Sequence, residues 1–224
     1  MLVLLIAGLM AATAPSPLEI ARDQQDRATL EKLANDYSAA AAKAPNDAVA
    51  QYRAALAASY QAEVALEVRD KKQAEQAAER GAKLAERAVA LKPDVAEYYR
   101  ILGTLCGQVA AGNLLTGLSY GKRAQEAINK AVEKDPKSPT VYLARGVGNY
   151  YLPAALGGGL DLAIADFRKA LSLDAKNAEA YLWLGLSLRK QNKNTEAREA
   201  FTKAIELNPN RIWVKQQLDK TPAK

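Results

Sequence analysis

The sequence predicts an all-α fold, a solenoid in which antiparallel helix pairs stack on one another. Three observations predict it. Apolar residues recur at helical spacing along most of the 224-residue chain, and alanine, the best helix former, is abundant. A helix end of the form Ala-x-x-x-Asp/Asn/Lys-Pro, followed by a polar turn, occurs three times. Its proline and its alanine each recur at the same intervals, which is the signature of a repeat architecture.

The repeat markers divide the chain into units that shorten toward the C-terminus. The intervals between successive markers fall from 48 to 34 residues, and the units span residues 48–95, 96–138, 139–177 and 178–211. The turn markers are Pro45, Pro93, Pro136, Ala175 and Pro209, and the alanine markers are Ala40, Ala88, Ala131, Ala170 and Ala204.

The last unit shows the helix pair most clearly. Its first helix places Tyr181, Leu184, Gly185 and Leu188 on one face, and residues 191–194 form a polar turn. Its second helix places an alanine and large apolar residues on one face, and Pro209 prevents that helix from continuing. Small residues on the facing sides allow the two helices to pack closely.

These residues make the stretch 178–211 similar to the tetratricopeptide repeat. The signature residues are Tyr181, Leu184, Gly185, Ala197, Phe201, Ala204 and Pro209. The three earlier units match more loosely, so the resemblance covers about residues 48–211. It implies a right-handed superhelix, here of a bacterial member with elongated or loop-inserted early repeats.

The earlier units depart from the 34-residue standard of this family. In the first unit both helices are lengthened, to Ala48–Val68 and Lys71–Leu91. In the second unit, Ala111-Gly112-Asn113 is the expected turn. In the third, residues 153–159 form a loop that ends in three glycines, which favour no helix.

Caps are expected at both ends, because a solenoid otherwise exposes apolar faces. Residues 17–47 form the N-terminal cap, with one long amphipathic helix over 18–42. Residues 212–224 form a short capping helix and tail, with Trp213 as a lid on the last repeat.

The first 14 residues resemble an export signal. Leu2–Met10 is an uncharged apolar run, and Ala12-Thr13-Ala14 has the small-x-small form of a cleavage site. We therefore expect an exported, periplasmic protein. No Lys or Arg precedes the run and Pro15 follows the cleavage position, so a cytoplasmic protein with a misassigned start is the alternative.

Composition favours binding over catalysis. The chain has no histidine and one cysteine, so imidazole ligands, histidine-activated nucleophiles and cysteine metal knuckles are excluded. We expect no cofactor and no metal. Cys106 lies in an apolar stretch, where it is either a buried core residue or a reactive thiol. Gly157-Gly158-Gly159 is either an inter-helix loop or a phosphate-binding helix start, although it lacks the remaining residues of a P-loop.

The net charge of +6 is mild, and basic residues alternate with acidic ones on helical faces. The C-terminal quarter is somewhat more basic, but no basic stripe is present. We therefore expect no nucleic-acid partner.

By the resemblance, the first helices of successive units line a concave groove in which partners dock. The candidate site residues there are Tyr52, Tyr60, Arg100, Gln108, Arg145, Asn149, Tyr150, Tyr151 and Arg189, together with apolar neighbours. Tyrosine offers contact area and a hydroxyl, which suits recognition. Tyr52 and Leu56 occupy the first positions of the family's lysine/asparagine carboxylate clamp, so that clamp is not expected here.

Arg145 and Asn149 replace residues that the family usually keeps apolar. A buried arginine needs a partner or a wet cavity. Either the two form a polar pocket with Tyr150, or Arg145 pairs with a carboxylate such as Asp161 or Asp166; we favour the ion pair.

The sequence is consistent with two functions. The first is a non-enzymatic scaffold that binds a protein or peptide in the groove. The alternative is a periplasmic carrier or transport accessory for a small apolar ligand or lipid, since the architecture also resembles the tetratricopeptide partner protein of TRAP-type solute transporters.

Overall fold

The computed structural model describes residues 14–112 and 114–223, and in these ranges every regular element is a helix. The all-α prediction is confirmed. The predicted export signal falls almost entirely outside the described residues. The α-helices are α1 (Pro17–Asp23), α2 (Arg27–Lys43), α3 (Ala48–Glu67), α4 (Lys71–Leu91), α5 (Ala96–Gly112), α6 (Leu114–Lys134), α7 (Pro139–Tyr151), α8 (Leu160–Leu173), α9 (Ala178–Lys190), α10 (Asn194–Leu207) and α11 (Ile212–Asp219).

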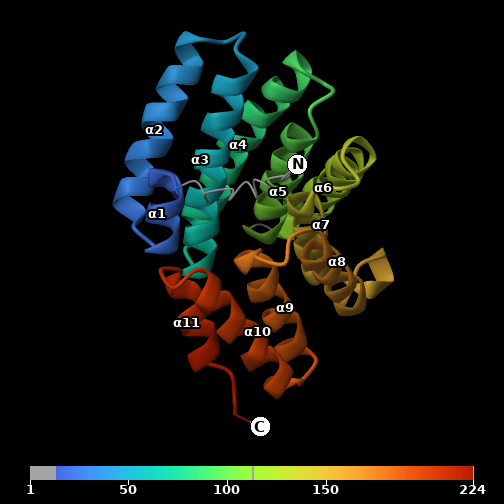
Figure 1. Ribbon diagram of the computed structural model, residues 1–224. Coiled ribbons are helices and arrows are strands. Elements are labelled where there is room, and N and C mark those ends of the chain that lie inside the picture. Colours follow the sequence, from blue (N-terminus) through green and yellow to red (C-terminus); the bar gives the residue numbers. More distant parts are fainter. Residues whose placement is uncertain (1–13, 113, 224) are drawn as a thin grey trace, which may run out of the picture.

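Helices α3 to α10 form four consecutive antiparallel pairs that follow the predicted units (Figure 1). Short polar side chains start several of these helices: Asp47, Asp70, Ser138 and Asn177 each accept a hydrogen bond from a backbone N–H of the first turn. Such caps satisfy donors that the helix itself leaves unpaired. Among the described residues, no helix is both long and apolar enough to span a bilayer.

Small residues bring the two helices of a unit together. A Cβ placed on Gly185 would lie 2.7 Å from the ring of Phe201, and one on Gly146 would lie 2.5 Å from the ring of Phe167. Each phenylalanine of a second helix therefore occupies the space that a side chain on the first helix would need. This explains why the signature pairs a glycine with a large residue, and both phenylalanines are fully buried.

The predicted long N-terminal helix is wrong, because the structure contains two helices there. Helix α1 ends at Asp23, and Gln25 takes a φ of 53°, which breaks the helix. Asp26 then caps α2 by accepting hydrogen bonds from the backbone N–H and the hydroxyl of Thr29. Local capping chemistry thus overrides the continuous apolar periodicity.

The loop between α7 and α8 contains one 3₁₀ turn, Ala154–Leu156, before the three glycines. Their backbone N–H groups donate to the carbonyls of Ala154, Pro153 and Asn149 in turn. The glycine run therefore closes a turn and presents no free N–H cradle for phosphate.

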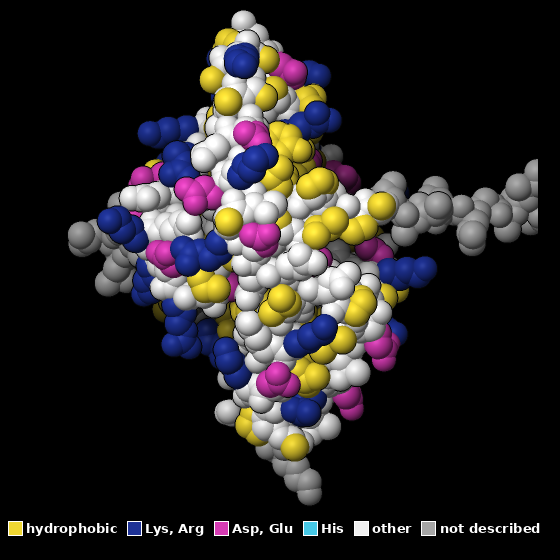
Figure 2. All heavy atoms as spheres, turned by 90° about the vertical axis from the view of Figure 1, so that its left-hand side faces the viewer, with side chains coloured by type: hydrophobic (Ala, Val, Ile, Leu, Met, Phe, Trp, Pro, Cys, Tyr) yellow, Lys and Arg dark blue, Asp and Glu magenta, His cyan; other side chains and the backbone are white. Residues whose placement is uncertain are grey.

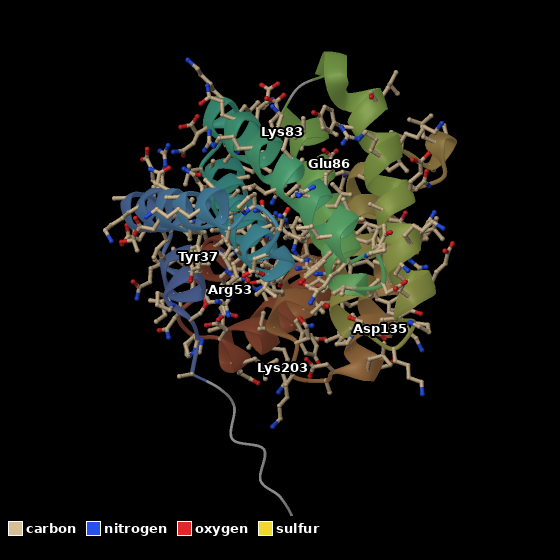
Figure 3. All side chains as sticks on the ribbon, turned by 90° about the horizontal axis from the view of Figure 1, so that it is seen from above. Tyr37, Arg53, Lys83, Glu86, Asp135 and Lys203 are labelled. Atoms are coloured by element: carbon tan, nitrogen blue, oxygen red, sulfur yellow. The ribbon has the colours of Figure 1, made fainter. Side chains whose placement is uncertain are left out.

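The stack of units curves until its two ends meet. In Figure 1, α11 lies directly below α1 and the end of α3. From above, the helices surround a centre filled by side chains (Figure 3). On the outer side that carries α1 and α2, acidic and basic residues are interspersed (Figure 2). The two predicted caps therefore contact each other, which the repeat pattern did not predict.

Candidate functional site

The candidate site is the concave face of this closed stack, formed by the first helix of each unit. On α3 the inward positions continue at intervals of three or four residues beyond the predicted tyrosines to two glutamates. The residues that contacts bring together on this face are Tyr52, Tyr60, Glu63 and Glu67 of α3, Glu97 and Arg100 of α5, Tyr150 and Tyr151 of α7, and Glu179, Trp183 and Arg189 of α9.

One hydrogen-bonded group joins α3 to α5 at the concave face. The hydroxyl of Tyr52 donates to Oε1 of Glu97 at 2.8 Å, and the Arg100 guanidinium donates to both oxygens of the same carboxylate at 2.6 and 2.7 Å. Burial alone would raise the pKa of Glu97, but Arg100 and these hydrogen bonds hold that pKa below its ordinary value. Glu97 is therefore a fixed anion, and Arg100 is committed to it.

Helix α1 covers part of the same face. The Arg22 guanidinium lies 5.0 Å from the ring centroid of Tyr60, a cation–π contact. Burial raises the pKa of the Tyr60 phenol to about 12, despite the opposing effect of the nearby Arg22. The hydroxyl of Tyr60 therefore stays protonated at neutral pH.

The two ends of the stack join at a seam between α1 and α3 on one side and α9 to α11 on the other. Arg211, 1% exposed, lies at its centre. Its guanidinium donates to Glu63 at 2.7 Å and to Glu179 at 3.0 Å, and it forms a short contact with Glu67. These partners lie on α3 and α9, so one side chain ties together both ends.

Further polar contacts complete the seam. The amide of Asn208 donates to Asp23 at 2.7 Å, and that of Gln216 donates to Gln25 at 3.1 Å. Asp23 in turn pairs with Arg22 at 2.6 Å. Hydrogen bonds and ion pairs thus join the two sides of the seam.

Carboxylates and guanidinium groups are mixed around the seam and the adjoining concave face. Five carboxylates, from Asp23, Glu63, Glu67, Glu97 and Glu179, face three arginines, Arg22, Arg100 and Arg211. Arg69, Arg189 and Lys220 line the adjoining pocket as well, so the surroundings carry no excess of negative charge.

Burial dominates the titration of these groups. Burial raises the pKa of Glu63 to about 7, because it outweighs the attraction of Arg211 and Arg22. Burial also raises the pKa of Glu67, whereas Arg211 and Arg22 together hold the pKa of Glu179 below its ordinary value. Within the described residues no acidic group is arranged to hold a metal ion.

Beside the seam, four aromatic side chains form a continuous surface. Tyr150 and Tyr151 each meet Trp183 edge to face, with ring centroids 5.5 and 6.0 Å apart, and Trp183 meets Trp213 at 5.7 Å. Tyr151 is 58% exposed, while Trp183 and Trp213 pack onto the core of the last unit, as the predicted lid requires.

The remaining predicted site residues serve within the fold. The Arg145 guanidinium donates from Nε to both oxygens of Asp166 at 3.0 Å and from Nη2 to Oδ1 at 2.5 Å, and the amide of Asn149 donates to Oδ2 at 2.9 Å. The ion-pair interpretation is confirmed, and these two residues face α8 instead of forming a polar pocket with Tyr150. The amide nitrogen of Gln108 donates to the carbonyl of Ser59, while its buried oxygen accepts from no described residue.

Basic residues of the C-terminal quarter largely bind their own chain. Arg189 donates to the side chain and carbonyl of Gln217, and Arg198 donates to the carbonyls of Leu218 and Thr221. Cys106 is fully buried, as the core interpretation predicts, and burial raises the pKa of its thiol to about 11.

Glu63, Glu67, Glu97 and Glu179 were missed by the sequence reasoning, although a signal was present. Glu63, Glu97 and Glu179 each lie three residues from a predicted lining residue on the same helix, and Glu67 lies four residues from Glu63. Residues at this spacing share one face of a helix, so all four glutamates face inward. Arg211, in contrast, follows a turn and lies far along the chain from its partners on α3.

A pocket of about 310 Å³ opens at the seam, between the end of α3 and helices α9 and α11. Most of its lining is charged or carries an amide: Glu67, Arg69, Arg189, Gln217 and Lys220, with Leu66 and Trp213.

Comparison with known proteins agrees with this architecture. The family model described as regulator of microtubule dynamics protein 1-3 matches residues 18–152, more than half of the chain. The chain belongs to this family. A tetratricopeptide repeat model matches residues 157–212, so this family member is also a tetratricopeptide repeat protein.

Individual relatives share the fold. A tetratricopeptide repeat protein of Thermus thermophilus superimposes with a TM-score of 0.64 at 19% identity, over 91% of this chain and 96% of that one. The haemophore HusA of Porphyromonas gingivalis gives 0.59 at 20% identity, over 80% and 96%. The small glutamine-rich tetratricopeptide repeat-containing protein 2 of Mycosarcoma maydis is 34% identical over 110 residues, 49% of this chain but only 30% of that protein.

Proposed function

We propose that this protein is a non-enzymatic scaffold that binds a protein or peptide partner on its concave face. The observation that carries the proposal is the lining itself: tyrosine, tryptophan and charged side chains of α3, α5, α7 and α9 gather beside the seam, and Tyr151 is 58% exposed. Large aromatic side chains with a polar edge are typical of residues that dominate binding energy at interfaces.

Family membership supports a protein partner. The family's description names regulation of microtubule dynamics, an action on a protein assembly, and the matching region contains α3, α5 and α7. The part of the lining that the family model covers is therefore the part that carries Tyr52, Tyr60 and Tyr151.

A photo-crosslinking experiment tests the proposal. A photoreactive phenylalanine analogue replaces Tyr151 on the concave face or, as a control, Leu118 on α6, which is 78% exposed. In cell extract we expect a discrete crosslinked species from the Tyr151 position alone. Equal labelling from both positions would contradict a groove-specific partner. Native mass spectrometry that finds a bound small apolar molecule and no protein would instead favour the carrier.

We propose in addition that the protein is exported to the periplasm. The support is the form of residues 1–14 in the sequence. N-terminal sequencing of the mature chain tests this: a start shortly after Ala14 in the envelope fraction is the expected result, and a cytosolic chain that begins at Met1 would refute it.

A further inference from the structure

We infer that the pocket at the seam binds a phosphomonoester, a phosphate group carried either by a small soluble molecule or by a phosphorylated side chain. The pocket has a volume of about 310 Å³, at the lower end of the range of small-molecule sites. Three features carry the inference: three cationic side chains line the pocket, its one carboxylate is bound by another arginine, and its residues come from both ends of the stack. The inference goes beyond the proposed function, because a small ligand can occupy this pocket without a protein partner.

Two of the three cationic side chains, those of Arg69 and Lys220, have no partner within the part of the chain that the structure describes. They line the pocket and are exposed, and neither side chain forms a hydrogen bond or an ion pair there. Asp70, which follows Arg69 in the sequence, is bound by Arg27 at 2.6 Å and caps α4. The charges of Arg69 and Lys220 are therefore available to an anion that enters the pocket.

The third cation, Arg189, is held in place by neutral groups. Its Nη1 donates to the carbonyl of Gln217 at 3.1 Å and to the hydroxyl of Thr221 at 3.2 Å, and its Nη2 donates to the side chain of Gln217 at 2.8 Å. A guanidinium has five N–H donors, so two remain for a ligand. Because the side chain is already ordered, it can form charge-assisted hydrogen bonds to a phosphate at little further cost in entropy.

The one carboxylate of the pocket, that of Glu67, is bound elsewhere. Both of its oxygens accept hydrogen bonds from Arg211, one of them also accepts from Gln25 at 2.8 Å, and its side chain is 2% exposed. Glu63 and Glu179 pair with Arg211 as well and do not belong to the pocket lining. A phosphomonoester carries a charge of about −1.5 to −2 at neutral pH, which suits a pocket lined by three cations.

The pocket also spans the seam. Leu66 lies at the end of α3 and Arg69 just after it, whereas Arg189 lies on α9 and Lys220 directly follows α11. A single bound phosphate would therefore interact with both ends of the stack, and a planar or apolar group attached to it can pack on Leu66 and on Trp213, which also line the pocket. Because the ligand needs both ends in place, its binding should stabilise the closed superhelix.

Isothermal titration calorimetry of the full-length protein tests the inference, at about 0.15 M salt, where distant surface charges are largely screened. The probes are phenyl phosphate, a phosphoserine peptide, and phenyl glucoside as an uncharged ring. We expect one phosphate-bearing probe per chain to bind at least about tenfold tighter than phenyl glucoside, because charge-assisted hydrogen bonds dominate the site. Tighter binding of phenyl phosphate than of the peptide supports a soluble ligand, and the reverse order supports a phosphorylated partner.

A double variant and a matched control locate the binding. Arg69→Asn with Lys220→Gln removes two exposed cations of the pocket, and asparagine tolerates the φ of 64° at position 69, so the fold should persist. This variant should bind the phosphate probes at least about tenfold more weakly. Lys83→Gln with Lys215→Gln removes the same charge from exposed positions outside the pocket and should change the affinity less than about twofold. Equal weakening in both variants would overturn the inference, because it would show an effect of net charge alone.

Hydrogen exchange places the ligand at the seam and separates this inference from the proposed function. A saturating phosphate probe should slow exchange of the amides of α1 and α11 in the wild-type protein but not in the pocket variant. If neither phosphate probe binds, or if binding leaves exchange at α11 unchanged, the inference is wrong. The crosslink at Tyr151 is an independent measurement: if it forms while no phosphate probe binds, the proposed function stands and the phosphate site does not.

Discussion

Replacing Arg211 with alanine should open the seam between the two ends of the superhelix. The substitution removes the guanidinium that Glu63, Glu67 and Glu179 share and leaves three carboxylates close together. Breaking a buried ion pair on one side costs about 3–5 kcal/mol, because the remaining charge stays buried without a partner.

The structure sets how that cost divides among the three carboxylates. Glu67 is the most enclosed, with a side chain 2% exposed, whereas Glu63 and Glu179 are 23% and 19% exposed and can regain water. A buried carboxylate that has lost its partner can avoid the cost of its buried charge by binding a proton. From an ordinary pKa of 4.5 this costs about 3.4 kcal/mol at pH 7, since each pKa unit corresponds to about 1.36 kcal/mol. Because burial already raises the pKa of Glu67 in the intact protein, Glu67 can account for a loss of at most about 3 kcal/mol.

The stability of the Arg211→Ala variant should also depend on pH. Without Arg211 the pKa of each carboxyl in the closed state rises above its unfolded value, so the closed state binds more protons than the open or unfolded state. Stability then increases as pH falls. At pH 5 protonation of Glu67 costs only about 0.7 kcal/mol, and the defect of Arg211→Ala should shrink by about 2–3 kcal/mol.

Denaturant unfolding at pH 7 and pH 5, together with hydrogen exchange of the amides of α1 and α11, measures this defect. We expect a large loss at pH 7, first seen as faster exchange at the two ends, and a smaller one at pH 5. Arg123→Ala is the matched control: its ion pair with Glu86 is about 40% exposed, and its loss should cost less than about 0.5 kcal/mol. A loss below about 1 kcal/mol for Arg211→Ala at pH 7, or an equal loss at both pH values, would refute the reasoning.

Three further predictions concern the interior. Gly185→Ala should destabilise the protein by about 1–3 kcal/mol in thermal or denaturant unfolding, because its Cβ would meet the Phe201 ring, whereas Gly148→Ala, with open space around it, should be neutral or slightly stabilising. Asp166→Asn should cost about 1–2 kcal/mol by weakening the bonds to the partly exposed Arg145. Cys106 should react with a thiol reagent at pH 8 only after unfolding, since burial raises its pKa to about 11; rapid reaction of the native protein would contradict this.

The repeat architecture could be predicted because its determinants are local. A proline after each unit, a glycine facing a large residue and helical apolar spacing all act over a few turns, so the bounds of α3 and α4 agree with the predicted helices to within one residue. The prediction of one long N-terminal helix was wrong for an equally local reason. The cap that Asp26 forms with Thr29 outweighs an apolar pattern that continues across it. Periodicity records which face is buried but not where the backbone breaks.

The concave site could be predicted only in part. The tyrosines could be expected there because the family places its groove on the first helices, whereas the glutamates beside them resemble ordinary charged helix surface. The contact between the two ends of the stack could not be predicted from the sequence, for a different reason. Arg211 and Glu63 are 148 residues apart in the sequence. Whether they meet in space depends on small rotations that accumulate over four units.

Closure also changes the environment of the carboxylates at the end of α3. An open solenoid leaves its ends solvated, so these carboxylates would be ordinary surface groups with little energetic effect. Once α10 and α11 return to α1 and α3, the same carboxylates are enclosed, and Arg211 becomes their partner. The shape of the concave face is therefore a property of the closed superhelix, and Arg211→Ala should perturb any binding there together with the seam.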